Sequence, residues 1–275
     1  MQMKISGNIK KLKTTLQSPV KYELPIDEAL IELNPFIGKS VRMQYDGEIN
    51  CISCGRKTKK SFQQGYCYPC FQSLPECDSC IIKPELCHYH EGTCRDSSWG
   101  ELHCFQDHIV YLSKTSGIKV GITRQPNVPS RWIDQGAIQA LPVFRVKDRL
   151  TSGKVEMIFK QHVADKTAWQ RMLKGETSDA DLAEERERLY SECKSEIQAL
   201  EKELGESAIQ YLANDQIVNI DYPVVTYPEK VKSFNFDKMP VVEGVLQGIK
   251  GQYLILDSGV LNIRKFSGYL ISLEV

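Results

Sequence analysis

The sequence of 275 residues has no long apolar run and no excess of charge of either sign. No stretch approaches the roughly 18 consecutive apolar residues that a membrane-spanning helix needs, and the basic stretch Met1–Lys13 lacks the apolar core of a signal peptide. Lys and Arg total 35, as do Asp and Glu, so overall charge attracts neither nucleic acid nor membrane. We therefore expect a cytoplasmic protein with no membrane partner, in which a local patch must meet any nucleic acid.

Cysteine is almost absent outside one segment. Nine of the ten cysteines lie between Cys51 and Cys104, and four of the five histidines lie in or beside the same stretch. A disulfide framework is typical of short secreted chains, whereas most of this longer chain is free of cysteine. The segment also has few helix or strand signals, so bound metal must replace the core that it lacks.

Two Cys-x2-Cys pairs open this segment, Cys51 with Cys54 and Cys67 with Cys70. Two thiolates on one tight turn can both reach a Zn²⁺ ion at about 2.3 Å, and two such turns complete a tetrahedron. The spacing predicts a zinc-ribbon-like or treble-clef-like site. Four unliganded buried thiols are the structural alternative, and an iron–sulfur cluster is the metal alternative, although the histidine content favours zinc.

A second set of candidate ligands follows this tetrad. One further zinc needs four ligands and two need eight, so we predict two or three structural Zn²⁺ ions in total. We expect Cys77 and Cys80 to share an ion, whereas the pairing of the others stays open, and His88 and His103 are the weakest candidates. The predicted ligands after the tetrad are Cys77, Cys80, Cys87, His90, Cys94, Cys104 and His108.

The chain divides into five segments, which together predict an α+β fold. A β segment over 1–50 is expected to pair with a C-terminal β segment over 213–275, so that both termini form one small β domain. Between them lie the multi-zinc Cys/His region over 51–108, a mixed module over 109–175 and a long amphipathic helix over 176–212. The apolar seam of that helix contains Leu182, Leu189, Cys193, Ile197, Leu200 and Leu204.

Turn residues support the two β segments. Val41, Met43 and Tyr45 alternate onto one face before Asp46-Gly47, which predicts a hairpin there. In the C-terminal segment, two apolar runs flank Ser258-Gly259 and predict another hairpin.

Within the module, Ile109–Leu112 and Lys119–Ile122 are predicted strands. A short helix over Pro129–Gln135, a strand over Leu141–Val146 and a helix from Thr151 should follow. A second short helix is expected over 167–173.

This order of elements and residues resembles the GIY-YIG nuclease superfamily over residues 109–173. In that superfamily a β-hairpin bears the two namesake tripeptides, one helix presents an arginine, and a later helix presents a metal-binding glutamate. Tyr111 occupies the tyrosine of the first tripeptide, and Gly121 occupies the glycine of the second. Ile109 and Lys119 depart from the pattern, because they replace the first glycine and the second tyrosine.

The resemblance implies a catalytic set of Tyr111, Lys119, Arg131 and Glu156. Arg131 would contact the scissile phosphate, and Glu156 would hold Mg²⁺ or Mn²⁺. Either Tyr111 or Lys119 would orient or deprotonate the attacking water. The structural alternatives are a strand aromatic, a solvated lysine and an exposed helix glutamate.

Local charge supports a nucleic-acid partner, either DNA or RNA. Residues 109–175 contain twelve Lys or Arg and four Asp or Glu, whereas residues 176–204 contain four basic and ten acidic residues. A basic face beside Trp132 and Trp169 suits a phosphate backbone and stacked bases. The alternative is that the acidic helix packs on the basic module and neutralises it.

Four runs of the chain resemble a bacterial family of zinc-containing proteins of unknown function, namely Gly65–Phe71, Cys87–Arg95, Lys119–Arg124 and Gly248–Ile263. We therefore expect a zinc-binding, nucleic-acid-binding protein, for which the GIY-YIG resemblance implies a metal-dependent endonuclease. One alternative is a non-catalytic zinc-stabilised adaptor that binds a protein partner through the long helix. Another is a nucleic-acid modification enzyme that uses the Cys/His region.

Overall fold

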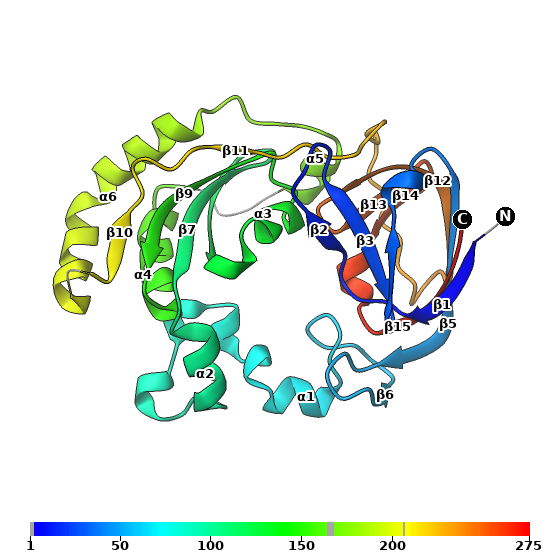
Figure 1. Ribbon diagram of the computed structural model, residues 1–275, viewed down its shortest axis with the longest axis horizontal. Coiled ribbons are helices and arrows are strands. Elements are labelled where there is room, and N and C mark those ends of the chain that lie inside the picture. The colour runs from blue at the N-terminus through cyan, green and yellow to red at the C-terminus, as the bar shows by residue number, and fades with distance from the viewer. Residues whose placement is uncertain (1–2, 164–167, 206) are drawn as a thin grey trace.

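Strands from both ends of the chain form one antiparallel sheet (Figure 1). The computed structural model describes residues 3–163, 168–205 and 207–275. Along this sheet the strands run in the order β1 (Lys4–Asn8), β15 (Tyr269–Glu274), β5 (Ser40–Asn50), β12 (Val241–Lys250), β13 (Tyr253–Leu256) and β14 (Gly259–Asn262), and β6 (Lys57–Thr58) pairs with the end of β5. The N-terminal and C-terminal segments are thereby paired directly, strand to strand.

A smaller sheet packs against this one. It contains β2 (Lys13–Thr15), β3 (Lys21–Ile26) and β4 (Ala29–Glu32). Tyr22 and Leu24 on β3 are fully buried in the same apolar core as residues of the terminal strands. We call the two sheets together the β domain.

The predicted hairpin at Asp46-Gly47 is wrong, because β5 runs unbroken through these two residues. Its neighbours are β12 and β15, from the far end of the chain. The pairing with β15 shifts register between Tyr269 and Ile271, beside Gly47, whose φ is +80°. Asp-Gly here forms a bulge, because a strand already paired on both sides has no need to fold back. The hairpin at Ser258-Gly259 is confirmed, since it joins β13 to β14.

The second large sheet lies in the middle of the sequence. Its order is β8 (Ile118–Arg124), β7 (His108–Lys114), β9 (Gln139–Val146) and β10 (Ile209–Tyr211), and β11 (Val218–Asn219) also pairs with β9. Helix α3 (Ser130–Asp134) follows β8, helix α4 (Arg149–Lys160) follows β9, and a short helix α5 (Trp169–Leu173) comes later. The order predicted for the module, two strands, a helix, a strand and a helix, is confirmed by β7, β8, α3, β9 and α4. The predicted start of the last short helix, Thr167, lies outside the described residues.

Two helices cover the face of this sheet that points away from the β domain (Figure 1). They are α4 and the long helix α6 (Leu182–Leu204), whose predicted seam is buried from Leu182 to Leu200. Asp181 caps the start of α6 by accepting backbone hydrogen bonds, as acidic N-caps do. The opposite face of the sheet receives α3 and joins the core of the β domain. No helix among the described residues is long and apolar enough to cross a membrane.

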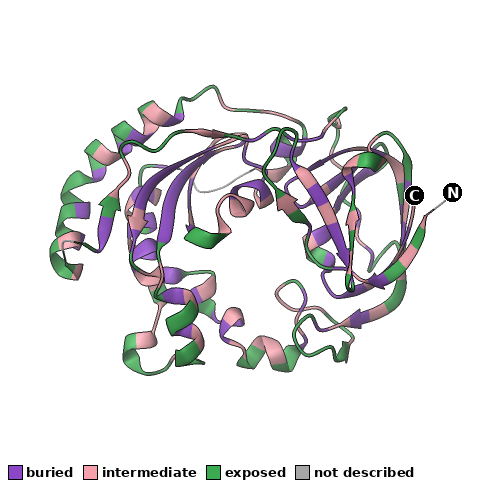
Figure 2. Ribbon diagram, in the orientation of Figure 1, coloured by how far each residue is buried: buried purple, intermediate pink, exposed green. Residues whose placement is uncertain are grey.

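The Cys/His region connects the two parts of the molecule at the bottom of Figure 1. It contains α1 (Tyr68–Ser73), α2 (Ser97–Cys104) and, between them, four single turns of 3₁₀ helix: η2 (Pro75–Cys77), η3 (Ser79–Ile81), η4 (Pro84–Leu86) and η5 (Tyr89–Glu91). Figure 2 shows that exposed and intermediate residues dominate this region, whereas the strands of the second sheet are largely buried. The region therefore has little apolar core of its own.

Candidate functional site

Four cysteine thiols converge between β6 and α1. Cys51 and Cys54 lie on the turn after β5, while Cys67 is the N-cap of α1 and Cys70 lies within it. All four sulfur atoms lie within 4.8 Å of one another, and the Sγ atoms of Cys54 and Cys67 are 3.8 Å apart. The predicted tetrad is therefore assembled, and it could hold a metal ion.

The thiols of this tetrad differ in how readily they ionise. Burial opposes ionisation of Cys51, but backbone N–H groups of Cys54, Cys67 and Ser53 outweigh it and lower the pKa of Cys51 to about 6. Removal from water, together with hydrogen bonds to the other three thiols, raises the pKa of Cys70 to about 12. Four thiolates this close repel one another, so all four ionise together only around a cation. The donor set fits Zn²⁺, which prefers four thiolates in a tetrahedral structural site.

The predicted ligands after the tetrad separate into two groups. Cys80, Cys87, Cys94 and Cys104 line one small enclosed cavity. Cys77 does not line this cavity. Burial, and then the charges of Glu76 and Cys51, raise the pKa of Cys77 to about 11.

The histidines of this region make other contacts. His90 is exposed and lies edge-on to Tyr89 and Phe105. His108 is fully buried, and its Nδ1 lies 2.7 Å from the carbonyl oxygen of Gln106. Neither histidine joins a metal-ligand cluster within the part of the chain that the structure describes.

The β7–β8 hairpin places Tyr111 and Lys119 on one face of its sheet. Tyr111 pairs directly with Gly121, and Ser113 pairs with Lys119, and directly opposed residues of antiparallel strands share a face. Tyr111 is completely buried, and its hydroxyl donates a hydrogen bond to Oε1 of Gln135 at 2.9 Å. Burial raises the pKa of Tyr111 to about 12, although the nearby Arg131 guanidinium opposes the shift.

Helix α3 brings Arg131 to this face. The neighbouring Trp132 packs its ring 5.7 Å from that of Tyr111, centroid to centroid. The β domain holds the helix in place through Asp134, which accepts a hydrogen bond from Gln252 at 2.8 Å and pairs with Lys11 at 2.8 Å. The position of Arg131 therefore depends on residues from both ends of the chain.

Glu156 lies on helix α4, which packs on the other face of the sheet from α3. Its side chain is nearly buried, with 8% of its surface exposed, and it pairs with Lys160 at 3.2 Å. The charge of Glu156 also raises the pKa of Tyr111. This effect is smaller than that of burial, and the charge of Arg131 opposes it. Asp148 starts this helix two residues before the predicted start, because its carboxylate accepts the backbone N–H of Thr151 at 2.7 Å.

Sequence reasoning missed several residues beside this site. Arg264 follows β14, and its guanidinium lies near the guanidinium of Arg131 and the carboxylate of Asp134. Burial lowers the pKa of Arg264, and the charge of Arg131 lowers it further. Ser113 Oγ and Trp132 Nε1 are buried without a hydrogen-bond partner among the described residues. A pair of basic residues after a predicted hairpin, Arg264-Lys265, was the only signal in the sequence, and it has no distinctive spacing.

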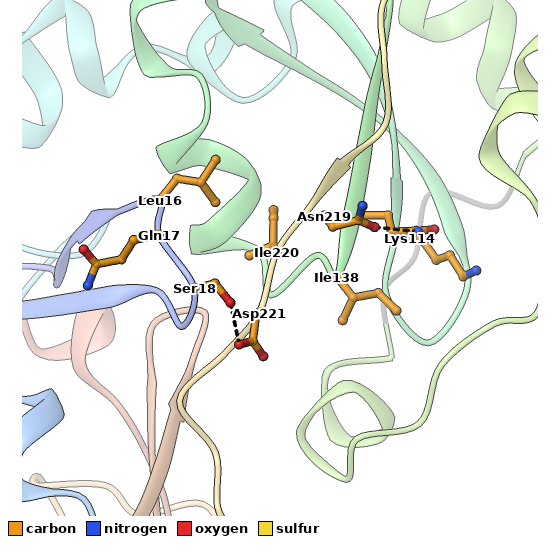
Figure 3. A pocket seen from close by; sticks show the side chains of 9 residues that line it. Leu16, Gln17, Ser18, Lys114, Ile138, Asn219, Ile220 and Asp221 are labelled. Atoms are coloured by element: carbon orange, nitrogen blue, oxygen red, sulfur yellow. Dashed lines mark hydrogen bonds between the residues drawn. The ribbon is translucent and has the colours of Figure 1, made fainter.

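A separate cavity of about 470 Å³ lies where the second sheet meets the β domain (Figure 3). Ser18 of the β domain donates a hydrogen bond across the junction to Asp221 at 3.0 Å, and within the second sheet Gln139 donates to Asn219 at 2.8 Å. Lys114, the last residue of β7, also lines it. This cavity therefore adjoins the strand that carries Tyr111 without containing the predicted catalytic set.

Comparison with known proteins places most of the chain in one family. The matching family is described as "Protein of unknown function (DUF2797)", and the match covers residues 38–271. The chain belongs to this family, which confirms the expectation of a family of unknown function. No curated protein and no solved structure matches the chain.

Proposed function

We propose that this member of the DUF2797 family is a zinc-stabilised nucleic-acid-binding protein that cleaves phosphodiester bonds in the manner of a GIY-YIG endonuclease. One observation carries the proposal. Tyr111, Arg131 and Glu156 come from a strand and two different helices, yet the charges of the arginine and the glutamate both act on the tyrosine hydroxyl. Three weak sequence matches whose charges influence one hydroxyl support the proposal more than each match alone.

Tyr111 acts in this proposal as a hydrogen-bond donor. With a pKa of about 12 its hydroxyl keeps its proton at neutral pH, and it already donates to Gln135. A group of that pKa is a poor general base near pH 7. Between the two predicted roles, orienting the attacking water therefore suits Tyr111 and leaves deprotonation to Lys119 or to solvent.

Arg131 and Arg264 supply the positive charge that a phosphodiester needs. The Arg131 guanidinium lies close enough to Arg264 to help burial lower the pKa of Arg264, and two guanidinium groups that repel one another gain most from a bound anion. Their planar N–H donors suit phosphate oxygens. The developing charge on the phosphate would be stabilised by groups already in position.

Glu156 is the carboxylate that would bind a divalent cation in this proposal. Its oxygens fit Mg²⁺ or Mn²⁺ in donor type, and its pairing with Lys160 shows that the site already accepts positive charge. When bound, the cation would stabilise negative charge on the leaving group. Zn²⁺ in the tetrad has the separate role of folding the Cys/His region.

The distribution of charge favours one face for nucleic acid. Helix α6 neutralises part of the module on the far side of the sheet, where Lys154 pairs with Glu203 at 2.7 Å. Arg131 lies on the other side of the sheet, with α3. The same packing weakens the adaptor alternative, because the apolar seam of α6 is occupied by the sheet and by α4.

The test is Glu156→Gln, which removes the charge and keeps the size of the side chain. Purified parent protein should cut labelled DNA or RNA with added Mg²⁺ or Mn²⁺, and the variant should fall to the background rate with unchanged zinc content. Glu196→Gln, at an exposed position on α6, is the matched control and should cut like the parent. Equal cutting by Glu156→Gln and the parent would refute the nuclease assignment.

A further inference from the structure

A second cluster of metal-ligand atoms lies in the Cys/His region, and its donors are of three kinds. Asp78, Cys80 and His88 each offer one ligand atom, and these atoms lie within 4.8 Å of one another. Asp78 lies between η2 and η3, Cys80 lies in η3, and His88 directly precedes η5. Carboxylate oxygen, thiolate sulfur and imidazole nitrogen are the donors that bind Zn²⁺ in proteins. Asp78 is absent from the ligands that spacing predicts, and His88 is among the weakest candidates there.

The carboxylate of this cluster is buried but retains free positions for a cation. Asp78 and Cys80 expose only 7% and 8% of their surface. Arg95 donates a hydrogen bond to Oδ2 of Asp78 at 2.9 Å, and Ser79 donates one to Oδ1 at 3.2 Å. A carboxylate has about four lone-pair positions, so these two donors do not use all of its capacity.

Hydrogen bonds fix the position of the proton on the His88 ring. The Thr93 hydroxyl has a single proton, which it donates to the carbonyl oxygen of His88 at 3.2 Å. Nδ1 of His88 lies 2.8 Å from the same hydroxyl oxygen, so Nδ1 is the donor in that bond. The neutral ring then carries its lone pair on Nε2. A histidine that binds metal usually donates its other ring N–H to a neighbouring acceptor in this way.

The lone pair on Nε2 faces another acceptor. Oδ2 of Asp78 lies 3.4 Å from Nε2 of His88. Two acceptors in this position need either a second proton on the ring or a cation that both can bind. The sulfur of Cys80 in the same cluster favours the cation, because an imidazolium paired with a carboxylate gains little from a thiol, whereas a zinc-type ion binds all three groups.

The three residues also line one small enclosed cavity, whose volume is about 20 Å³. A single water molecule needs roughly 10–15 Å³ of such space. Zn²⁺ with three protein ligands takes a water molecule as its fourth ligand. The cavity therefore has room for the water molecule that would complete the coordination of an ion at this cluster.

The remaining thiols on the wall of this cavity do not form a competing set. Cys87, Cys94 and Cys104 line it as well, but none of them belongs to a group of three close ligand atoms within the described residues. Sγ of Cys94 donates instead to the carbonyl oxygen of Asp96 at 3.4 Å. Geometry therefore favours the mixed set of donors over a set of thiols.

Arg95 keeps the carboxylate of the cluster in position. Besides its bond to Asp78, this guanidinium donates to the carbonyl oxygens of Phe71 and Leu74, both at 3.0 Å. These carbonyls lie at the end of α1, the helix that carries Cys70 of the tetrad. Asp78 is thus connected to an element that the tetrad also holds.

We propose that Asp78, Cys80 and His88 bind a second divalent cation of the zinc type, with water as the fourth ligand, and that this ion joins η3 to η5. The Cys80 thiol releases its proton to solvent as its sulfur binds the ion, and no electron is transferred. The Cys/His region has little apolar core, so a cross-link between its turns stabilises it.

Metal content measures the first half of this proposal. The full-length parent, purified with zinc, should contain two equivalents by elemental mass spectrometry, whereas His88→Gln and Asp78→Ala should each contain one. Cys54→Ser should lose the other equivalent. His103→Gln and Cys94→Ser are the matched controls and should keep both. One equivalent in the parent overturns the proposal, and so does a loss in Cys94→Ser with both equivalents kept in His88→Gln.

X-ray absorption at the zinc edge keeps the test open if the variants are insoluble, because it uses the parent alone. Zn–S distances of about 2.3 Å are resolved from Zn–N and Zn–O distances of about 2.0–2.2 Å. One four-thiolate ion and one ion with a single thiolate give an average of about 2.5 sulfur ligands per zinc. An average of about four overturns the proposal. These readouts are independent of cleavage, so they stand or fall apart from the nuclease assignment.

Amide hydrogen exchange measures the second half. In His88→Gln the amides of residues 81–92 should exchange at least about tenfold faster than in the parent, because an opening that the ion opposes becomes easier. His103→Gln should show no such acceleration. Unchanged exchange in His88→Gln would show that the ion does not join these turns.

Discussion

The ring of Tyr111 lies against Gly121 of the neighbouring strand, closer than any other residue at that position would permit. A Cβ atom on Gly121 would lie 2.7 Å from both Cζ and Oη of Tyr111. The strand register sets the two residues directly opposite each other. The missing side chain of the glycine therefore gives the tyrosine hydroxyl its place beside Gln135.

From this relationship we expect Gly121→Ala to lower the free energy of unfolding by about 1–3 kcal/mol, since the added methyl group overpacks a site whose ring is wholly buried. Urea unfolding with zinc present measures the change. Gly117→Ala is the matched control, because a Cβ there meets nothing within 4 Å. Equal stability of the two variants would mean that the ring does not occupy this position.

Chelation of the tetrad metal should change the reactivity of its thiols selectively. Cys54 is exposed, so only a bound ion protects it from a disulfide reagent. Cys193 on α6 is buried, and burial raises its pKa to about 11, so it should stay unreactive until the chain unfolds. Mass spectrometry of the labelled peptides with and without chelator makes the comparison. Labelling of Cys54 at the same rate in both conditions would contradict metal binding.

Salt dependence should test whether the protein binds nucleic acid through the face that carries Arg131. If Arg131 contacts a phosphate, Arg131→Gln should reduce the slope of log affinity against log salt concentration by about 0.7–0.9, the value for one released counterion. Lys154→Gln is the control, because Lys154 pairs with Glu203 at 2.7 Å beneath α6. Fluorescence anisotropy at several salt concentrations measures both. Equal slopes for parent and Arg131→Gln would remove Arg131 from the interface.

The parts of the site that sequence predicted depend on local spacing. Cys51 and Cys54 share one turn, whose Gly55 has a φ of +70°, and such a pair needs no distant partner to form. Tyr111 and Lys119 share a face because strands alternate and the connecting loop is short. Each of these relationships follows from geometry within a few residues.

The parts that sequence missed depend on distant segments. The Asp46-Gly47 bulge follows from partners almost two hundred or more residues away, in β12 and β15, which outweigh the turn preference of this dipeptide. Arg264 reaches Arg131 only because the β domain packs on α3. Cys77 and Cys80, whose spacing suits chelation, lie in two successive 3₁₀ turns, η2 and η3. No periodic signal marks such turns.

Acid should destabilise the protein through His108, the first residue of β7. Burial lowers the pKa of His108 to about 4, so the ring is neutral in the folded state. The charges of Arg149 and Arg124 add to this shift, whereas the hydrogen bond to the backbone carbonyl of Gln106 and the charge of Asp148 oppose it. The unfolded chain binds a proton below about pH 6.5, where the folded chain does not. Stability therefore rises with pH across this window and is lost as the pH falls from about 6.5 toward 4.

His108→Gln should cancel this dependence, because glutamine does not titrate while its amide can still donate to the carbonyl of Gln106. The difference in unfolding free energy between parent and variant should change by about 2 kcal/mol between roughly pH 7.5 and pH 5, the parent losing more. Release of zinc in acid affects both proteins and cancels in the difference. The same substitution at exposed His90 is the control. A difference that does not change with pH would show that His108 is protonated, or bound to metal, in the folded protein.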